Sequence, residues 1–305
     1  MNTNKVISKK TKVNRGWRDK LFYGICGTIL TLALLIVLFP IMNIVSSAFS
    51  DPKAVTAGKV WLFPVDFSLE SFKNVLKFDK VWIGYKNTIF YTLVGTVMNV
   101  IITLFCAYPL AQKRFIGRKF MSKMLLITML FGGGMIPSYL LVKELHLLNT
   151  RWAVLLPGLM SAYNVIITRT YIETNISGEL DDAARIDGCS PIQFFFRFII
   201  PLSKSIIAII TMYYAVGHWN SYFGAFLYLN DSELYPLQLF LREILLQTQL
   251  DASAFDDPEM AAQMQSQAEA LKYSVIVVAT APLMCVYPLV QKHFVKGVMI
   301  GSVKG

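Results

Sequence analysis

Long apolar runs alternate with short polar segments along the whole chain. Of its 305 residues, 55% are hydrophobic and only 16% are charged. A helix needs about 20 mostly apolar residues to cross a hydrocarbon core of about 30 Å. The sequence therefore predicts an all-α, polytopic membrane protein with six transmembrane helices. The expected spans are residues 21–46, 87–110, 124–142, 152–172, 206–229 and 273–290.

The net charge of +10 does not indicate nucleic acid as a partner, because the basic residues lie where the expected membrane topology places them. The basic segments "KVISKKTKVNRGWRDK" and "QKRFIGRKFMSK" flank apolar runs, whereas the segment from 230 to 270 carries many acids and Arg242 as its one base. Short loops rich in lysine and arginine stay in the cytoplasm. We therefore expect both termini and the loops near 115 and 185 inside, with contact to membrane lipid and none to nucleic acid.

This topology divides the chain into a cytoplasmic basic arm, residues 1–20, and a single transmembrane domain, residues 21–305. The domain has an outer loop at 47–86, a long cytoplasmic loop at 173–204, an outer lobe at 230–271 and a cytoplasmic tail at 291–305. The third expected span contains Gly132, Gly133 and Gly134 followed by Pro137. These residues indicate either close helix packing through small side chains or a bend that lines a pathway.

Catalytic and metal-binding patterns are absent from the sequence. It has no GxxxxGK[ST] loop, no C-x-x-C and no H-E-x-x-H, and its three histidines are scattered. We expect neither enzymatic activity, nor a metal, nor a cofactor in this chain. The spans also hold almost no ionisable residue, which argues against a proton or sodium relay. Energy for transport would then come from another subunit, with an ion-coupled secondary transporter as the alternative.

The cytoplasmic stretch "ELDDAARIDGCSPIQFFFRFIIPL", residues 179–202, is too polar to lie in lipid. Ser177 can cap a helix whose first turns carry acids, and Gly188 permits a left-handed helix end. Leu180, Ala184 and Gly188 share one stripe, small enough for another protein surface to approach. A second helix should begin at Pro191. An amphipathic interfacial segment is the alternative.

This stretch resembles the EAA loop of ABC importer permeases, whose pattern is E-A-A, three residues, G, nine residues, I-x-L-P. Asp182, Ala183 and Ala184 match E-A-A, Gly188 matches G, and Phe198, Ile200 and Pro201 match I-x-L-P. The segments "YAVGHWNSYFGAFLYL" and "FVKGVMIGSVKG" extend the resemblance to carbohydrate-importer permeases of the maltose-permease G and lipoprotein-type C kind. Asp for Glu, Phe for Ile and Ile for Leu depart from the pattern but keep charge sign or apolar character.

The resemblance implies a permease subunit of the bacterial cytoplasmic membrane that has no ATPase of its own. Its expected partners are a second homologous permease chain, two ATPase subunits that bind ATP and Mg, and an extracellular solute-binding protein that delivers a sugar, presumed an oligosaccharide. A non-sugar solute is the alternative. The residues implied in coupling to the ATPase lie in loop 173–204: Glu179, Asp182, Ala183, Ala184, Arg185, Asp187, Gly188 and Pro201.

Two further sets of residues follow from the resemblance and the side-chain chemistry. The tail residues Val303, Lys304 and Gly305 resemble a family ending that reaches between the ATPases; a flexible basic end is the alternative. Aromatic faces and neutral hydrogen-bonding groups suit a sugar pathway, and helix packing or an aromatic belt would use the same residues. The pathway candidates are Tyr163, Asn164, Tyr214, His218, Trp219, Asn220 and Tyr222.

Overall fold

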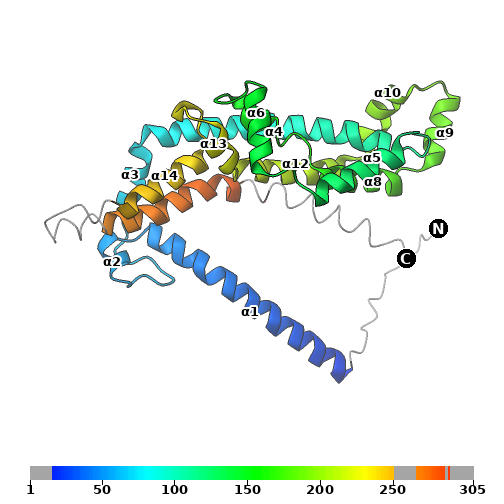
Figure 1. Cartoon of the computed structure of the whole chain (residues 1–305). Coiled ribbons are helices and arrows are strands. Elements are labelled where there is room, and N and C mark those ends of the chain that lie inside the picture. The colour runs from blue at the N-terminus through cyan, green and yellow to red at the C-terminus, as the bar shows by residue number, and fades with distance from the viewer. Residues whose placement is uncertain (1–15, 251–265, 286–287, 289–305) are drawn as a thin grey trace, which may run out of the picture.

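A computed structural model describes residues 16–250, 266–285 and 288, and this described part is helical with no strand. An all-α fold is therefore confirmed for these residues (Figure 1). The helices are α1 (Trp17–Ala48), α2 (Pro52–Thr56), α3 (Glu70–Lys77), α4 (Asp79–Ala111), α5 (Arg118–Leu130), α6 (Met135–Glu144), α7 (Arg151–Leu155), α8 (Ala162–Asn175), α9 (Gly178–Ile186), α10 (Pro191–Phe194), η1 (Phe195–Ile199), α11 (Ile200–Leu202), α12 (Lys204–Trp219), α13 (Phe223–Tyr228), η2 (Ser232–Leu234), α14 (Leu237–Leu250) and the helix Ser266–Cys285.

Helix α4 is the central element of the bundle. Its 33 residues pack against α8, α12 and α14, and it buries polar side chains as well as apolar ones. At its outer half, Asn87 donates hydrogen bonds to the carbonyls of Glu233 and Tyr235, at 2.7 and 3.1 Å. The Thr88 hydroxyl accepts one from the backbone N–H of Leu237. Since these partners precede or begin α14, polar groups of α4 hold that outer segment in place.

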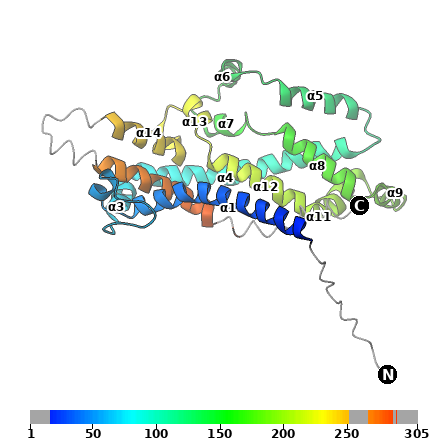
Figure 2. The ribbon, with the colours of Figure 1, turned by 90° about the horizontal axis from the view of Figure 1, so that it is seen from below.

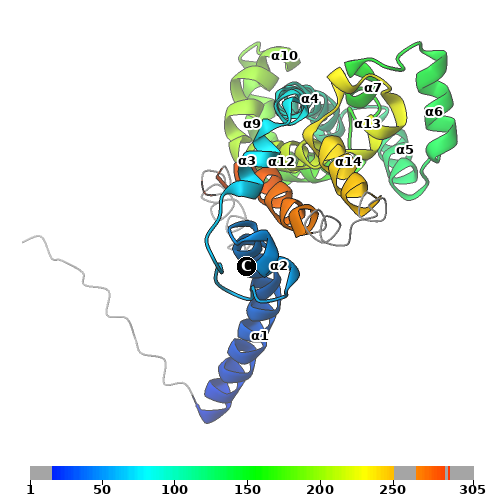
Figure 3. The same ribbon diagram turned by 90° about the vertical axis from the view of Figure 1, so that its left-hand side faces the viewer.

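Helix α1 is equally long and lies apart from this bundle. Its axis diverges from the other helices, so that contact is confined to its C-terminal end (Figure 3). Ser46, Ser47 and Ala48 are its buried residues, and Ser274 donates a hydrogen bond to the Ala48 carbonyl at 3.3 Å. The helix begins at Trp17, inside the arm expected at 1–20, and its most apolar stretch has no buried residue.

Three helices in the described part are long and apolar enough to cross a membrane, or up to five if each bent pair counts as one span. The three are α1, α4 and Ser266–Cys285. The bent pairs are α5 with α6, at 114°, and Pro191–Leu202 with α12, at 80°. Six spans therefore stay a prediction. The fourth, expected at 152–172, divides into α7 and α8 around Pro157 and Gly158.

The third expected span bends at its glycines, which agrees with the second of our two interpretations, although a pathway lined by this bend stays a prediction. Gly134 has φ of +85° and ends the connection between α5 and α6, which turn through 114°. Nothing lies within 4 Å of a side chain built at Gly132 or Gly133, and both are exposed. Close packing of these glycines within the chain is therefore wrong. The run serves to redirect the backbone, because glycine tolerates conformations closed to other residues.

The fifth and sixth expected spans also begin or end elsewhere than predicted. Helix α12 ends at Trp219 and the chain restarts as α13 at Phe223, so 206–229 is not one continuous helix. The last described helix already includes Ser266, the first residue described after the gap and seven residues before the expected start. It therefore takes in the end of the expected outer lobe, whose middle lies outside the described residues.

The bundle is elongated, with different elements at its two ends (Figures 1 and 2). Helices α2, α3 and α14 gather at one end, and α9 and α10 lie at the other. Separate apolar clusters occupy the two ends, one around Val75, Leu237 and Val275 and one around Leu104, Ala184 and Phe195. We name the α14 end the outer end and the α9 end the inner end after the topology that the charge rule predicts, and this orientation stays a prediction.

Candidate functional site

The inner-end helix α9 starts and stops as its sequence predicts. The Ser177 hydroxyl accepts a hydrogen bond from the backbone N–H of Glu179 at 3.1 Å, which caps the helix. Gly188 has φ of +78° just after the helix end. A second helix begins at Pro191, capped by Ser190, whose side chain and that of Gln193 bond reciprocally to backbone N–H groups. These local signals therefore determine the two helix boundaries.

The small stripe of α9 faces inward, which corrects our expectation for Ala184. This residue is 7% exposed and belongs to the inner apolar cluster with Leu104, Val165 and Phe195. Leu180 packs against the same cluster. The stripe therefore anchors α9 to its own chain, and Ala184 does not offer a face to another protein.

The opposite face of α9 is the exposed one. Glu179, Asp182, Ala183, Arg185, Asp187 and Gly188 are all exposed on it or at its end. Ile186, which the sequence analysis missed, is 87% exposed. Ile186 lies two residues after the buried Ala184, on the other side of the helix, so its exposure could be inferred only once the burial of Ala184 was known.

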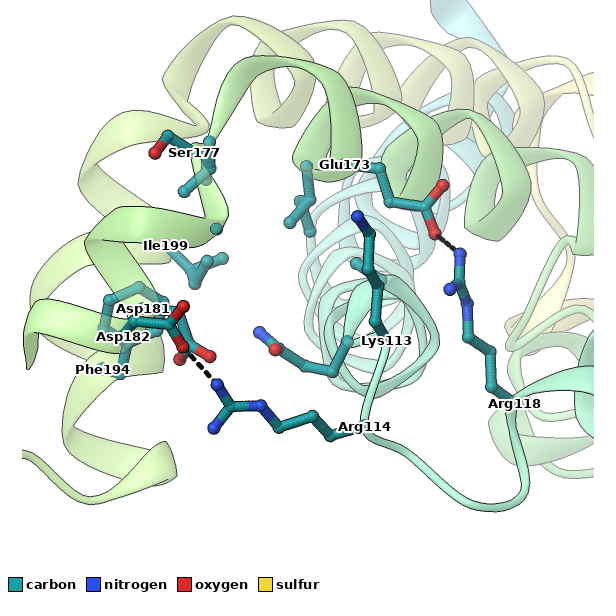
Figure 4. A pocket seen from close by; sticks show the side chains of 14 residues that line it. Lys113, Arg114, Arg118, Glu173, Ser177, Asp181, Asp182, Phe194 and Ile199 are labelled. Carbon is teal, nitrogen blue, oxygen red and sulfur yellow. Dashed lines mark hydrogen bonds and ion pairs between the residues drawn. The ribbon is translucent and has the colours of Figure 1, made fainter. Parts of the chain in front are cut away.

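One ion pair joins α9 to its surroundings, and another lies within the helix. Arg114, in the linker between α4 and α5, pairs with Asp182 (Figure 4). Arg185 pairs with Asp181, one turn earlier in α9 itself. In the isolated chain, Asp182 of α9 is thus already paired with a residue of the neighbouring linker. Both partners of the Arg114 pair are exposed, so solvent and salt screen it strongly.

Next to the Arg114–Asp182 pair, a second group of charged residues joins α5 to α8. Arg118 pairs with Glu173, which also accepts a hydrogen bond from Arg169 at 2.8 Å (Figure 4). Arg169 donates a further bond to the Ser122 hydroxyl at 2.9 Å. A cavity of about 310 Å³ lies between these pairs and α9. The linker, α5, α8 and α9 are therefore connected around one small cavity.

Beyond α9, the chain passes to α12 through α10, η1 and α11. The rings of Phe105 and Tyr108 on α4 pack against Phe195, with centroids 5.1 and 5.3 Å apart. Pro201 lies in α11, where the direction of the chain changes by 80° before α12. The segment after α9 is thus held against α4 and leads directly into a membrane helix.

Halfway along the bundle, a polar cluster joins α4, α12 and the break between α7 and α8. Asn99 donates a hydrogen bond to the Gly158 carbonyl at 2.6 Å, and its Oδ1 lies 2.7 Å from His218 Nε2. One turn along, the hydroxyls of Thr103 and Tyr214 lie 2.7 Å apart. The Tyr214 hydroxyl also accepts from the backbone N–H of Ser161 at 3.2 Å. We call these residues the midspan polar cluster.

Tight packing accompanies these hydrogen bonds. A side chain added at Gly95 would lie 2.5 Å from His218 Nε2, closer than real contacts allow. The glycine therefore makes the room in which the histidine ring reaches Asn99.

The comparisons with known proteins agree with this geometry. Residues 7–300 match the family model described as "Binding-protein-dependent transport system inner membrane component". The chain belongs to this family. It is therefore the permease subunit of an ABC transporter, and the family's permeases lack an ATPase of their own.

Several relatives of this permease carry sugar-transport names. It is 39% identical over 94% of its length to the polygalacturonan/rhamnogalacturonan transport system permease protein YtcP of Bacillus subtilis (strain 168), covering 98% of that protein. It is 40% identical to Protein LplC of the same organism, over 88% of this chain and 90% of that one. Its fold matches a chain of a bacterial ABC transporter involved in the import of the acidic polysaccharide alginate, with TM-score 0.81, 34% identity, and coverage of 92% and 99%.

The pathway candidates do not gather in one site. Tyr214 and His218 belong to the midspan polar cluster. Asn164 is buried, and its neighbour Tyr163 is 49% exposed. The Trp219 indole N–H donates to the Ala279 carbonyl at 3.1 Å, which is a packing role. Asn220 and Tyr222 line a cavity beside α14.

Part of the expected site lies outside the described residues. This applies to Val303, Lys304 and Gly305 and to the whole tail from 291. Their contact with an ATPase remains a prediction.

Proposed function

We propose that this permease imports an oligosaccharide handed over by an external solute-binding protein, in a complex with a second homologous permease and two ATPase subunits. ATP and Mg would be bound by the ATPases. The observation that carries the proposal is the construction of α9. This helix is fixed to its own chain by Leu180 and Ala184 and exposes a charged face with Ile186 at the end of the molecule.

The charge pattern supports placing this face in the cytoplasm, where ATP is available. Lys113, Arg114 and Arg118 lie beside α9, around the cavity of about 310 Å³. Basic residues next to membrane helices favour the cytoplasmic side. We infer six spans with both termini inside, so that Val303, Lys304 and Gly305 would face the same ATPases.

The contacts also supply a route from α9 to the membrane. Ala184 moves with the inner cluster that contains Leu104 of α4 and Phe195 of η1, and η1 continues into α12. Because packed cores transmit displacement with little loss, a push on α9 would shift α12 relative to α4. The midspan polar cluster lies between those two helices. Two packings of this cluster would correspond to inward- and outward-open states, as alternating access requires.

The proposed cargo rests on side-chain chemistry and on the sugar names of the relatives. The candidate pathway offers hydroxyl, amide and imidazole groups, which suit the many hydroxyls of a sugar. An oligosaccharide fits the relatives named for polygalacturonan and rhamnogalacturonan and the structure named for alginate.

The coupling role of α9 can be tested at Gly188. No described residue lies within 4 Å of a side chain added at this position, so we expect bulk added there to meet an external partner. We expect Gly188→Asn in the assembled complex to abolish ATP hydrolysis stimulated by the binding protein and sugar. Asparagine tolerates positive φ better than most residues, which limits backbone strain. The measurement is stimulated ATPase activity in proteoliposomes.

The matched control is Gly58→Asn at the outer end. Gly58 has φ of +66° and, like Gly188, nothing within 4 Å of an added side chain. The control should retain stimulation. Normal stimulation in Gly188→Asn, with the ATPases still bound, would remove α9 from the coupling route.

A further inference from the structure

The outer half of the permease contains a second cavity, of about 550 Å³, between α14, the end of α12 and the helix Ser266–Cys285. Apolar side chains form much of its wall. Neutral polar groups reach it from three elements: Asn220 and Tyr222 after α12, Gln238 on α14 and Thr280 on the last described helix. Tyr222 is 41% exposed, so part of its ring is free to stack. These are the groups that recognise a sugar ring.

Arg242 is the one charged residue among the described residues that line this cavity. Its guanidinium stacks over the ring of Phe226, with Cζ 4.6 Å from the ring centroid. No carboxylate in the described part of the chain lies within 4 Å of it. Stacking occupies the face of a guanidinium and leaves its N–H edge available, and that edge matches a carboxylate with two parallel hydrogen bonds.

The acids nearest in sequence are directed elsewhere. Tyr235, in the segment before α14, has a pKa raised by burial first and then by the negative charges of Glu243 and Asp231. Those two carboxylates therefore act on Tyr235, and neither lines the cavity. Glu269 and Lys272, at the start of the last described helix, do not line it either. Among the described residues, the cavity thus keeps a partly buried positive charge that no carboxylate pairs with.

We infer that this outer cavity binds an acidic sugar unit, whose carboxylate pairs with Arg242 while Asn220, Gln238 and Thr280 bond to its hydroxyls. This inference rests on the proposed import function and narrows its cargo to oligosaccharides that contain uronic acids. A partly desolvated guanidinium left unpaired is costly, so a neutral sugar would bind less well than a charged one. Arg242 is then a specificity-determining residue at the outer entrance.

The test compares Arg242→Gln with the wild type in the complete complex, reconstituted with its partner permease, ATPases and binding protein. The probes are trigalacturonate and its methyl ester, which differ in charge and little else. We expect the wild type to prefer the acid, and the variant to lose about tenfold or more of acid uptake at limiting concentration. Uptake of the ester should be unchanged. Lys272→Gln removes an exposed charge close by and is the matched control.

Three results would overturn the inference. The wild type and Arg242→Gln take up the acid equally, the wild type imports the ester at the same rate as the acid, or the wild type imports neither compound. Repeating the assay with and without phosphatidylglycerol separates a sugar carboxylate from a lipid phosphate. A variant effect seen only with that lipid also overturns the inference. The proposed function is tested separately by the Gly188 experiment. It fails if ATPase stimulation does not depend on α9, that is, if Gly188→Asn stimulates like the wild type.

Discussion

Helices α1 and α4 are nearly the same length, 32 and 33 residues, and both are apolar enough to cross a membrane, yet they occupy opposite positions in the fold. Helix α1 touches the bundle only near its end, and α4 is its centre. The difference lies in the polar side chains. Those of α4, such as Asn87, Asn99 and Thr103, bond to other helices or segments along much of the helix. In α1, the bonds from Asn43 and Ser46 to the carbonyls of residues 60–62 lie near the C-terminal end, and Thr28, farther from that end, bonds to its own Gly24 carbonyl.

The comparison separates two questions that a hydropathy pattern combines. Apolar side chains place a helix in lipid, but they do not make one helix prefer another to lipid tails. Small residues and interhelical hydrogen bonds supply that preference. In this permease, Gly84 and Gly95 of α4 allow the close approach of α14 and His218, and the glycines of α1 face open space.

Glycine-to-alanine substitutions should give the largest contrast between the two helices. Gly95→Ala drives a methyl group into the His218 ring, so we expect a loss of about 1–3 kcal/mol in the free energy of unfolding. Gly27→Ala meets nothing within 4 Å and should be neutral or slightly stabilising. Unfolding by SDS titration in mild detergent measures the stability of both variants. Equal stability of the two variants would contradict the packing argument.

Removing an amide from α4 should have the next largest effect. Asn99→Leu keeps the side-chain volume but loses the bonds to Gly158 and His218. Each interhelical bond in a membrane contributes about 0.6 kcal/mol on average, so we expect a loss of about 1–2 kcal/mol and slower transport. The comparison variant is Thr28→Val in α1, whose hydroxyl bonds only within its own turn. If both variants lowered stability equally, interhelical bonding would not distinguish α4.

The smallest predicted effect concerns the second half of the midspan polar cluster. Tyr214→Phe removes the hydroxyl shared by Thr103 and Ser161 while leaving the ring in place. We expect a loss of about 0.5–1.5 kcal/mol and a changed transport rate, with ATPase contact at α9 intact. Thr28→Val in α1, whose hydroxyl bonds only within its own turn, is again the variant outside the bundle. A rate unchanged from the wild type would show that this half of the cluster only packs the helices.

Local features of the candidate site were predictable because they depend on neighbouring residues. Ser177 as a cap, the positive φ after α9 at Gly188 and the restart at Pro191 each follow from a backbone preference of one or two residues. The burial of Ala184 was not predictable in this way, since it depends on Leu104 and Val165, far away in the chain. The prominence of Ile186 follows from that burial, because fixing one side of α9 exposes the other.

By itself, the sequence determined that the chain is helical, that it lies in a membrane and that a polar helix pair interrupts its later spans. Apolar run length, charge placement and capping residues act locally and need no partner. Tertiary structure alone decided which apolar helix became the centre and which face of α9 is free. Each of these depends on contacts between residues tens of positions apart, where hydrogen bonds such as Asn99 to Gly158 and close packing at Gly95 select one arrangement among many that local preferences permit.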